Sequence, residues 1–220
     1  MMWPTICIDN FFNNPKQVLE YAKTLEYTPA EKGNWPGVRS KAIHELDNDF
    51  YTHIATKMIA ALYPNEWQDI GWLANSYFQK IDSRWKGPGW VHKDVHQQFS
   101  SIIYLSGDTS CGTSLYKENT HETVPLVNNI KTSSNLKPSK MKTAEYKKAL
   151  EKHNKKFTKT VSFNSEINRC IMFDSYQYHA VDNFNKDDDS ERVTIITFFN
   201  SIFRHDGKPL NPHAGESSRI

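Results

Sequence analysis

The sequence has few cysteines, no long apolar run and almost no net charge. Its 220 residues contain three scattered cysteines and no Cys-x-x-Cys pair, which argues against a disulfide framework and a thiolate zinc site. No stretch approaches the roughly 18 consecutive apolar residues of a membrane helix. The N-terminus also lacks a basic region followed by an apolar one. We therefore expect one cytoplasmic domain over residues 1–220, with no membrane partner.

The formal charge of +2 is unevenly distributed along the chain. Ten lysines and two glutamates lie between residues 131 and 160, so this segment carries +8 and the remaining residues carry −6. We interpret residues 117–160 as a lysine-rich insertion within the domain. A solvated segment is the first interpretation, and a docking surface for an acidic partner is the second. Few aromatic residues accompany the lysines, which disfavours nucleic acid as a partner.

Hydrophobic periodicity predicts two N-terminal helices and then many short strands. The helices are expected over residues 15–25 and 49–62, and a third over 142–157 inside the insertion. After residue 70 the apolar residues alternate and turn signals become frequent. Strands are expected over residues 5–9, 72–81, 89–94, 99–105, 112–116, 160–163, 169–174, 178–183 and 192–200. This pattern predicts a mainly β fold, a double-stranded β-helix (jelly roll, cupin-like) with the N-terminal helices packed on one sheet.

One His-x-Asp triplet, His92-Lys93-Asp94, lies at the end of an expected strand. Residues i and i+2 of a strand point to the same face, so the imidazole and the carboxylate converge. Together with a second histidine they would form a 2-His-1-carboxylate site, which suits Fe(II). His179 is the best-placed second histidine because it begins a short strand after an apolar one. The alternatives lie in charged or loop-like surroundings: His96, His121, His153, His205 and His213.

A strand that is apolar on both faces begins with Arg192. Arg192 and Thr194 share one face of it. A guanidinium group in such a strand needs an anion, because an unpaired buried charge is strongly destabilising. The anion would be either an internal acidic side chain or the carboxylate of a ligand held by Arg192 and Thr194.

Taken together, these residues resemble the motif of the Fe(II)- and 2-oxoglutarate-dependent oxygenases. His92-x-Asp94, then His179, then Arg192-x-Thr194 thirteen residues later follow that family's order. The segments 102–105, 111–115 and 169–175 are similar to its neighbouring strands and turns. Residues 9–15 and 35–40 are similar to small bacterial and phage members.

The resemblance implies a role for each matching residue. His92, Asp94 and His179 would hold Fe(II), and Arg192 with Thr194 would bind the distal carboxylate of 2-oxoglutarate. O2 would be the second cosubstrate, with succinate and CO2 as products and hydroxylation as the usual outcome. Tyr77 and Tyr104 lie on strands that flank the His-x-Asp segment. Either tyrosine would hydrogen-bond the cosubstrate or serve as a core aromatic.

The substrate is less sharply indicated. Nucleic-acid demethylases of this superfamily have a second arginine six residues after the first, where this chain has Phe198. The chain is more similar to prolyl-hydroxylase-like members, which makes a peptide or protein side chain the first expectation and a free small molecule the second. The lysine-rich insertion would favour an acidic substrate. A cupin-like metal-binding protein without oxygenase activity is the alternative from another class, but it has no comparable task for Arg192.

Overall fold

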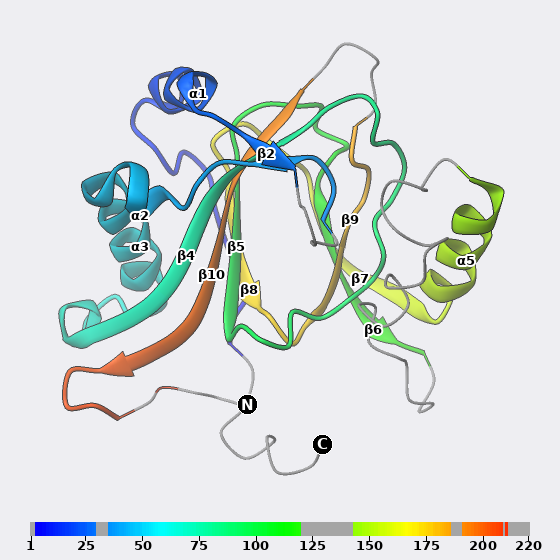
Figure 1. Ribbon diagram of the computed structural model, residues 1–220. Helices are drawn as coiled ribbons and strands as arrows, with labels where there is room; N and C mark the ends of the chain where they lie inside the picture. The colour runs from blue at the N-terminus through cyan, green and yellow to red at the C-terminus, as the bar shows by residue number, and fades with distance from the viewer. Residues whose placement is uncertain (1–2, 30–34, 120–142, 186–190, 209, 211–220) are drawn as a thin grey trace.

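The computed structural model describes residues 3–29, 35–119, 143–185, 191–208 and 210 (Figure 1). Residues 120–142 of the lysine-rich insertion, which include His121, lie outside the described residues, as does His213. Among the helices that are described, none is long and apolar enough to cross a membrane.

Three N-terminal helices form one layer of the molecule. They are α1 (Pro15–Thr24), α2 (Ile43–Leu46) and α3 (Asn48–Leu62), and a short 3-10 helix, η1 (Trp67–Asp69), follows them. The side chain of Asn14 accepts a hydrogen bond from the backbone N–H of Gln17 at the start of α1, and Asp47 does the same for Phe50 at the start of α3. These caps satisfy backbone donors that a helix leaves free at its N-terminus. Two of the three helices match the expected ones, whereas α2 was not predicted.

The remaining elements are mostly strands arranged in two antiparallel sheets. The larger sheet has the order β1-β8-β5-β10-β4-β3-β2 and the smaller one the order β7-β6-β9. The strands of the larger sheet are β1 (Ile6–Ile8), β2 (Thr28–Pro29), β3 (Val38–Arg39), β4 (Ile70–Ile81), β5 (Phe99–Tyr104), β8 (Cys170–Asp174) and β10 (Arg192–Arg204). Those of the smaller sheet are β6 (Thr113–Glu118), β7 (Phe157–Phe163) and β9 (Tyr178–Val181). This architecture is the expected jelly roll.

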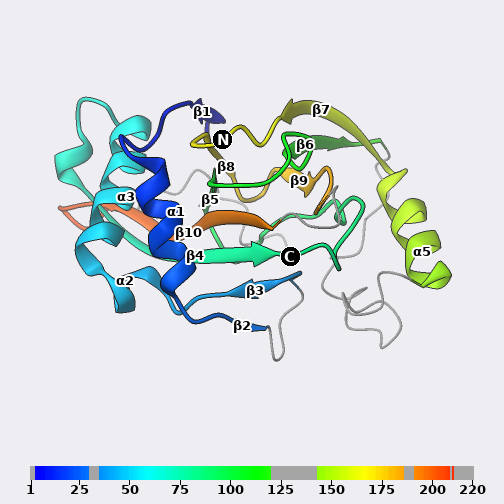
Figure 2. The same ribbon diagram turned by 90° about the horizontal axis from the view of Figure 1, so that it is seen from above.

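The helical layer covers one face of the larger sheet, and the smaller sheet lies on the other side (Figures 1 and 2). The main hydrophobic cluster joins Ile54 and Met58 of α3 with Phe78 of β4 and with Ile195 and Phe199 of β10. All five side chains are fully buried. Because this core lies between the helices and the sheet, the opposite face of the sheet is left to line a cavity.

A further helix, α5 (Ala144–Asn154), lies at the far end of the smaller sheet (Figure 1). It belongs to the second half of the lysine-rich insertion and falls within the expected helix. Tyr146, Leu150 and His153 form its buried stripe, and Phe157 just after it is also buried. Its lysines at positions 147, 148 and 152 are exposed. Within the insertion, α5 is therefore a packed helix with a solvated basic face, and the insertion also contains the end of β6 and the start of β7.

Candidate metal and ligand site

Three side chains from two segments converge between the sheets. His92, Asp94 and His179 each offer a ligand atom, and these atoms lie within 4.8 Å of one another. The Nε2 atom of His92 is 3.7 Å from Oδ1 of Asp94, and the Nε2 atom of His179 is 3.4 Å from Oδ2. Of the histidines that competed with His179 in the sequence, His153 bonds the carbonyl of Val91. The structure thus brings the three expected ligands together.

His92 and His179 are held opposite each other by their backbones. The N–H of His92 donates to the carbonyl of His179 over 3.0 Å, and the N–H of His179 donates back over 2.9 Å. Residues paired in this way across antiparallel segments place their side chains on the same face. The two imidazole rings accordingly have centroids 4.4 Å apart.

The strand expected over residues 89–94 is wrong, because the structure has only an isolated bridge between His92 and His179 there. The N–H of Gly89 donates to the carbonyl of Val181 on β9, which is one residue out of step with the pairing of His92 and His179, so no regular ladder forms. On its other edge the segment bonds α5. The N–H of Val91 donates to the side chain of Asn154, whose amide donates in turn to the carbonyl of Gly89. His153 bonds the carbonyl of Val91 over 2.7 Å. Side chains of α5 therefore take backbone groups that a neighbouring strand would otherwise bond, and α5 itself holds the His92 segment in place.

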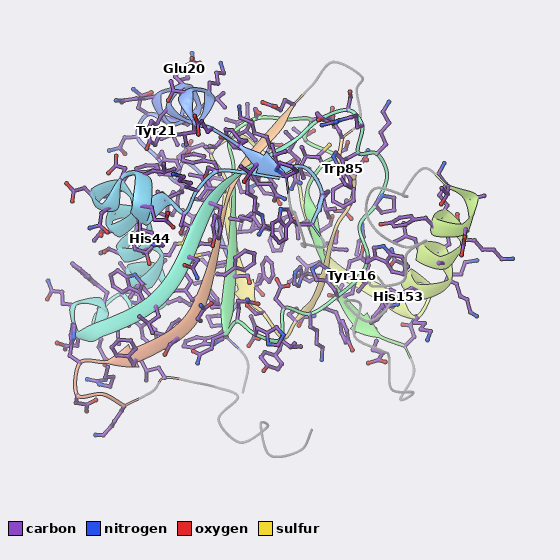
Figure 3. All side chains as sticks on the ribbon, in the orientation of Figure 1. Glu20, Tyr21, His44, Trp85, Tyr116 and His153 are labelled. Carbon is purple, nitrogen blue, oxygen red and sulfur yellow. The ribbon has the colours of Figure 1, made fainter. Side chains whose placement is uncertain are left out.

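His153 reaches from α5 toward the strands, whereas Glu20 and Tyr21 belong to the helical layer on the opposite side of the molecule (Figure 3). A second contact joins α5 to this segment, because the indole N–H of Trp90 donates to the hydroxyl of Tyr146 over 2.7 Å. The alternation of apolar residues predicts the buried stripe of α5 but not what the stripe contacts. The support that this helix gives to His92 could not be read from the sequence.

The hydrogen bonds of both histidine rings orient their second nitrogen toward Asp94. Nδ1 of His92 lies 2.7 Å from the carbonyl oxygen of Trp90, and Nδ1 of His179 lies 2.9 Å from that of Gln177. A carbonyl oxygen only accepts, so Nδ1 carries the proton in each ring and Nε2 keeps its lone pair. Outer hydrogen bonds of this kind are typical of metal-binding histidines. Two imidazole nitrogens and one carboxylate fit a site for Fe(II) or a similar divalent metal ion.

The triad opens into a cavity of about 770 Å³. Arg192, Thr194 and Tyr77 line it together with the triad. On β10, residues 192, 194, 196 and 198 face the cavity, whereas 193, 195 and 199 belong to the core beneath the helices. The alternation expected for this strand therefore places Arg192 and Thr194 in the same space as the three candidate ligands.

Arg192 is buried without an ionic partner. Its Nε atom has no hydrogen-bond partner, and no acidic side chain in the described part of the chain pairs with it. Removal from water lowers the pKa of its guanidinium group, an effect that the neighbouring Tyr104 opposes. Gly107 covers its stem, because a Cβ atom there would lie 3.3 Å from Cβ and Cγ of Arg192. The internal acidic partner that the sequence left open is not found among the described residues.

The two candidate tyrosines differ in their surroundings. Tyr104 is fully buried, and its hydroxyl donates to Oγ1 of Thr113 over 2.9 Å. Burial raises the pKa of Tyr104, so it stays protonated at neutral pH. Tyr77 instead lines the cavity. Its ring lies 5.8 Å from the guanidinium carbon of Arg39, a second cavity arginine that was not among the candidate site residues.

Arg39 escaped prediction because β3 has only two residues and follows a segment with the composition of a loop. The segment Trp35-Pro36-Gly37-Val38-Arg39-Ser40 is similar to small bacterial and phage oxygenases, but this similarity assigns no role to Arg39. A cation beside tryptophan in a glycine- and proline-rich turn is a weak signal. The role of Arg39 depends on which strand β3 pairs with, and the sequence does not show this.

Comparison with known proteins gives a family and a set of structural neighbours. A family model described as "Family of unknown function (DUF6445)" matches residues 2–199. Curated protein sequences give no significant match.

Several solved structures share the fold at very low sequence identity. HygX from Streptomyces hygroscopicus, solved with nickel and 2-oxoglutarate, has a TM-score of 0.54 at 9% identity, covering 89% of this chain and 82% of that one. The epimerase SnoN from nogalamycin biosynthesis, described as non-heme and alpha-ketoglutarate-dependent, has a TM-score of 0.52 at 10% identity, covering 93% and 80%. EvdO2 from Micromonospora carbonacea var. aurantiaca, solved with 2-oxoglutarate, has a TM-score of 0.53 at 8% identity, covering 91% and 87%. At such identities the likeness establishes the fold alone.

Proposed function

The chain belongs to the DUF6445 family, whose function is unknown, and we propose from its cavity residues that it is an Fe(II)- and 2-oxoglutarate-dependent dioxygenase. The observation that carries the proposal is the pairing, in one cavity, of a 2-His-1-carboxylate cluster with a buried arginine that lacks an ionic partner. A metal site alone would explain the 2-His-1-carboxylate cluster. A dicarboxylate cosubstrate that binds the metal at one end and Arg192 at the other would explain both the cluster and the unpaired arginine. HygX and EvdO2, which share the fold, were solved with 2-oxoglutarate.

In this proposal His92, Asp94 and His179 hold the iron through two Nε2 atoms and one carboxylate. The bound metal, with 2-oxoglutarate and O2, would supply an oxidative decarboxylation to succinate and CO2 and the oxidation of a substrate C–H bond. The backbone carbonyls behind each Nδ1 keep both rings in the ligating tautomer. Three protein ligands would leave other metal positions for exogenous ligands.

Arg192 would bind the distal carboxylate of 2-oxoglutarate, with the hydroxyl of Thr194 beside it. Both residues are buried, so the ion pair would form away from water, where a charge-assisted hydrogen bond is strong. Tyr77 lines the same cavity and is our candidate for a hydrogen bond to the cosubstrate. Tyr104 would act behind Arg192, since its ring lies 5.5 Å from the guanidinium carbon.

The substrate expectation divides between a peptide side chain and a free small molecule. A cavity of about 770 Å³ is within the usual range for small-molecule sites. HygX was also solved with hygromycin B, and SnoN with nogalamycin RO, which favours a free small molecule for this fold. We therefore propose a compact organic substrate and keep a peptide side chain as the second candidate. The prolyl-hydroxylase-like resemblance and the steering role of the lysine-rich insertion stay predictions.

The proposal is tested by anaerobic spectroscopy of the purified protein. Addition of Fe(II) and 2-oxoglutarate should produce a weak metal-to-ligand charge-transfer band in the visible range. His92→Ala should abolish the band because it removes one of three ligands. Lys93→Met is the matched control, since Lys93 lies between two ligands in the chain but places its Nζ atom 4.3 Å from the ring centroid of Tyr178. A folded wild-type protein that gives no band contradicts the assignment and leaves the cupin-like alternative.

A further inference from the structure

A second cationic side chain, that of Arg39 on β3, lines the cavity in addition to Arg192. It lies on β3, and its Cα atom pairs with that of Gln79 on β4, which pairs in turn with Thr194 on β10. The arginine and the threonine are thus separated by two strand spacings, roughly 10 Å across the sheet. Both belong to the same cavity as the three candidate metal ligands.

The local sequence fixes Arg39 at this place. Gly37 has a φ of 74°, and a Cβ atom there would lie 2.1 Å from the carbonyl oxygen of Lys80. Glycine therefore permits both the left-handed backbone and the close approach to β4. The side-chain amide of Gln79 donates to the carbonyl of Pro36 over 2.9 Å. The turn that carries Arg39 is consequently tied to the central sheet.

The guanidinium group of Arg39 is enclosed by aromatic rings instead of anions. Its central carbon lies 4.2 Å from the ring centroid of Trp35, 5.7 Å from that of Phe198 and 5.8 Å from that of Tyr77. Its Nε atom is buried without a hydrogen-bond partner. No ion pair joins Arg39 to an acidic side chain within the described ranges.

The surroundings of Arg39 do not neutralise its positive charge. Burial lowers the pKa of Arg39 to about 10, with partial opposition from Tyr77 and Asp94, so the group is still charged at neutral pH. The residue as a whole is half-buried, and contacts with aromatic faces are individually weak compared with the cost of removing a cation from water. An arginine held in this way is suited to an anion that arrives with a ligand.

The proposed cosubstrate does not supply that anion. One carboxylate of 2-oxoglutarate would bind the metal and the other would pair with Arg192, so none is left for Arg39. We infer that Arg39 binds an anionic group of the substrate, a carboxylate or a phosphate, while Trp35, Tyr77 and Phe198 contact the adjoining apolar part. As a statement about the substrate, this inference rests on the proposed function. The anion site itself does not require oxygenase chemistry.

Binding of small probes to the protein loaded with Ni(II) and 2-oxoglutarate tests the inference without turnover. Phenylacetate and phenyl phosphate are the anionic probes, and phenylacetamide is the neutral counterpart of the first. By calorimetry, wild-type protein should bind at least one anion about tenfold or more tightly than the amide, as a charge-assisted hydrogen bond would produce. The tighter of the two anions identifies the group. Equal affinities, or no measurable binding of either anion, overturn the inference.

Arg39→Met should remove this preference and leave the affinity for 2-oxoglutarate unchanged. Arg204→Met is the matched control, because Arg204 is paired with Glu66 and is not among the residues that line the cavity. It should keep the preference. If Arg39→Met weakens 2-oxoglutarate binding instead, Arg39 anchors the cosubstrate and the assignment to substrate is wrong.

Thermal unfolding of the ligand-free protein distinguishes a binding role from a structural one. Arg39 is half-buried and has no ionic partner among the described residues, so replacing it by an apolar side chain of similar length should stabilise the protein, and Arg39→Met should raise Tm by about 2–4 °C. A fall in Tm identifies Arg39 as a structural residue and overturns the inference. If the charge-transfer band is absent but the anion preference depends on Arg39, the proposed oxygenase function fails and the anion site remains.

Discussion

The two faces of the larger sheet are made by the same strands but carry different kinds of side chain. Toward the helices, β10 presents Val193, Ile195 and Phe199, which join one apolar cluster with the helical layer. Toward the cavity the same strand presents Arg192 and Thr194, followed by Ile196 and Phe198. The face toward the helices needs no ligand, because its apolar side chains pack against one another and against the helices.

The cavity face, in contrast, holds polar groups that the described part of the chain leaves unsatisfied. The Nε atoms of both cavity arginines are buried without hydrogen-bond partners. We therefore expect substitutions on the helix face to change stability and substitutions on the cavity face to change binding. Variants on each face test whether stability and binding are separable in this way.

Phe199→Ala should produce the largest change in stability. The ring is fully buried and packs against Phe99 with ring centroids 6.0 Å apart. Truncation of a buried phenylalanine lowers the free energy of unfolding by about 3–5 kcal/mol. Urea unfolding measures this loss, and metal titration of the folded variant should give the wild-type stoichiometry. Lost metal binding in a folded variant would show that the two faces are coupled.

Arg192→Ala should have the converse effect. Loss of a desolvated charge pair should weaken 2-oxoglutarate binding by about 2–5 kcal/mol. The stability of the ligand-free protein should fall much less than in Phe199→Ala, because the guanidinium group has no internal ionic partner. Titration of the Ni(II)-loaded protein with 2-oxoglutarate gives the affinity, and Arg192→Lys shows how much depends on the charge alone. Unchanged affinity would remove Arg192 from the cosubstrate site.

The sequence predicts β10 better than the segment around His92, for a physical reason. On β10 the two-residue alternation is regular from Arg192 to Phe199, before a register shift, so it correctly places Arg192 and Thr194 opposite the core residues. The choice of His179 as the second histidine ligand also follows from local signals, although His92 lies outside any regular strand. Beside it, backbone groups of Gly89 and Val91 bond side chains of α5, more than 60 positions away. Periodicity within a segment contains no information about such a partner.

Arg39 illustrates a second limit. Its strand has two residues, which is too short to show any period. What gives Arg39 its environment is the pairing of β3 with β4, which places it beside Tyr77 and Phe198. In the lysine-rich insertion the charge is evident from the sequence. The part that contacts the His92 segment, however, is the buried stripe of α5, through Tyr146 and His153.

The smallest expected effects separate the two tyrosines, which the sequence could not rank. Tyr104→Phe removes a hydroxyl that donates to Thr113 in the buried interior, so it should lower the free energy of unfolding by about 1 kcal/mol and leave 2-oxoglutarate affinity nearly unchanged. Tyr77→Phe should lower 2-oxoglutarate affinity by about 0.5–1.5 kcal/mol with little loss of stability, because Tyr77 faces the cavity. Paired unfolding and titration experiments on both variants give the four values. If Tyr104→Phe reduces the affinity more than Tyr77→Phe does, the cosubstrate lies at the Thr113 side of the cavity, against the Tyr104 and Thr113 pair.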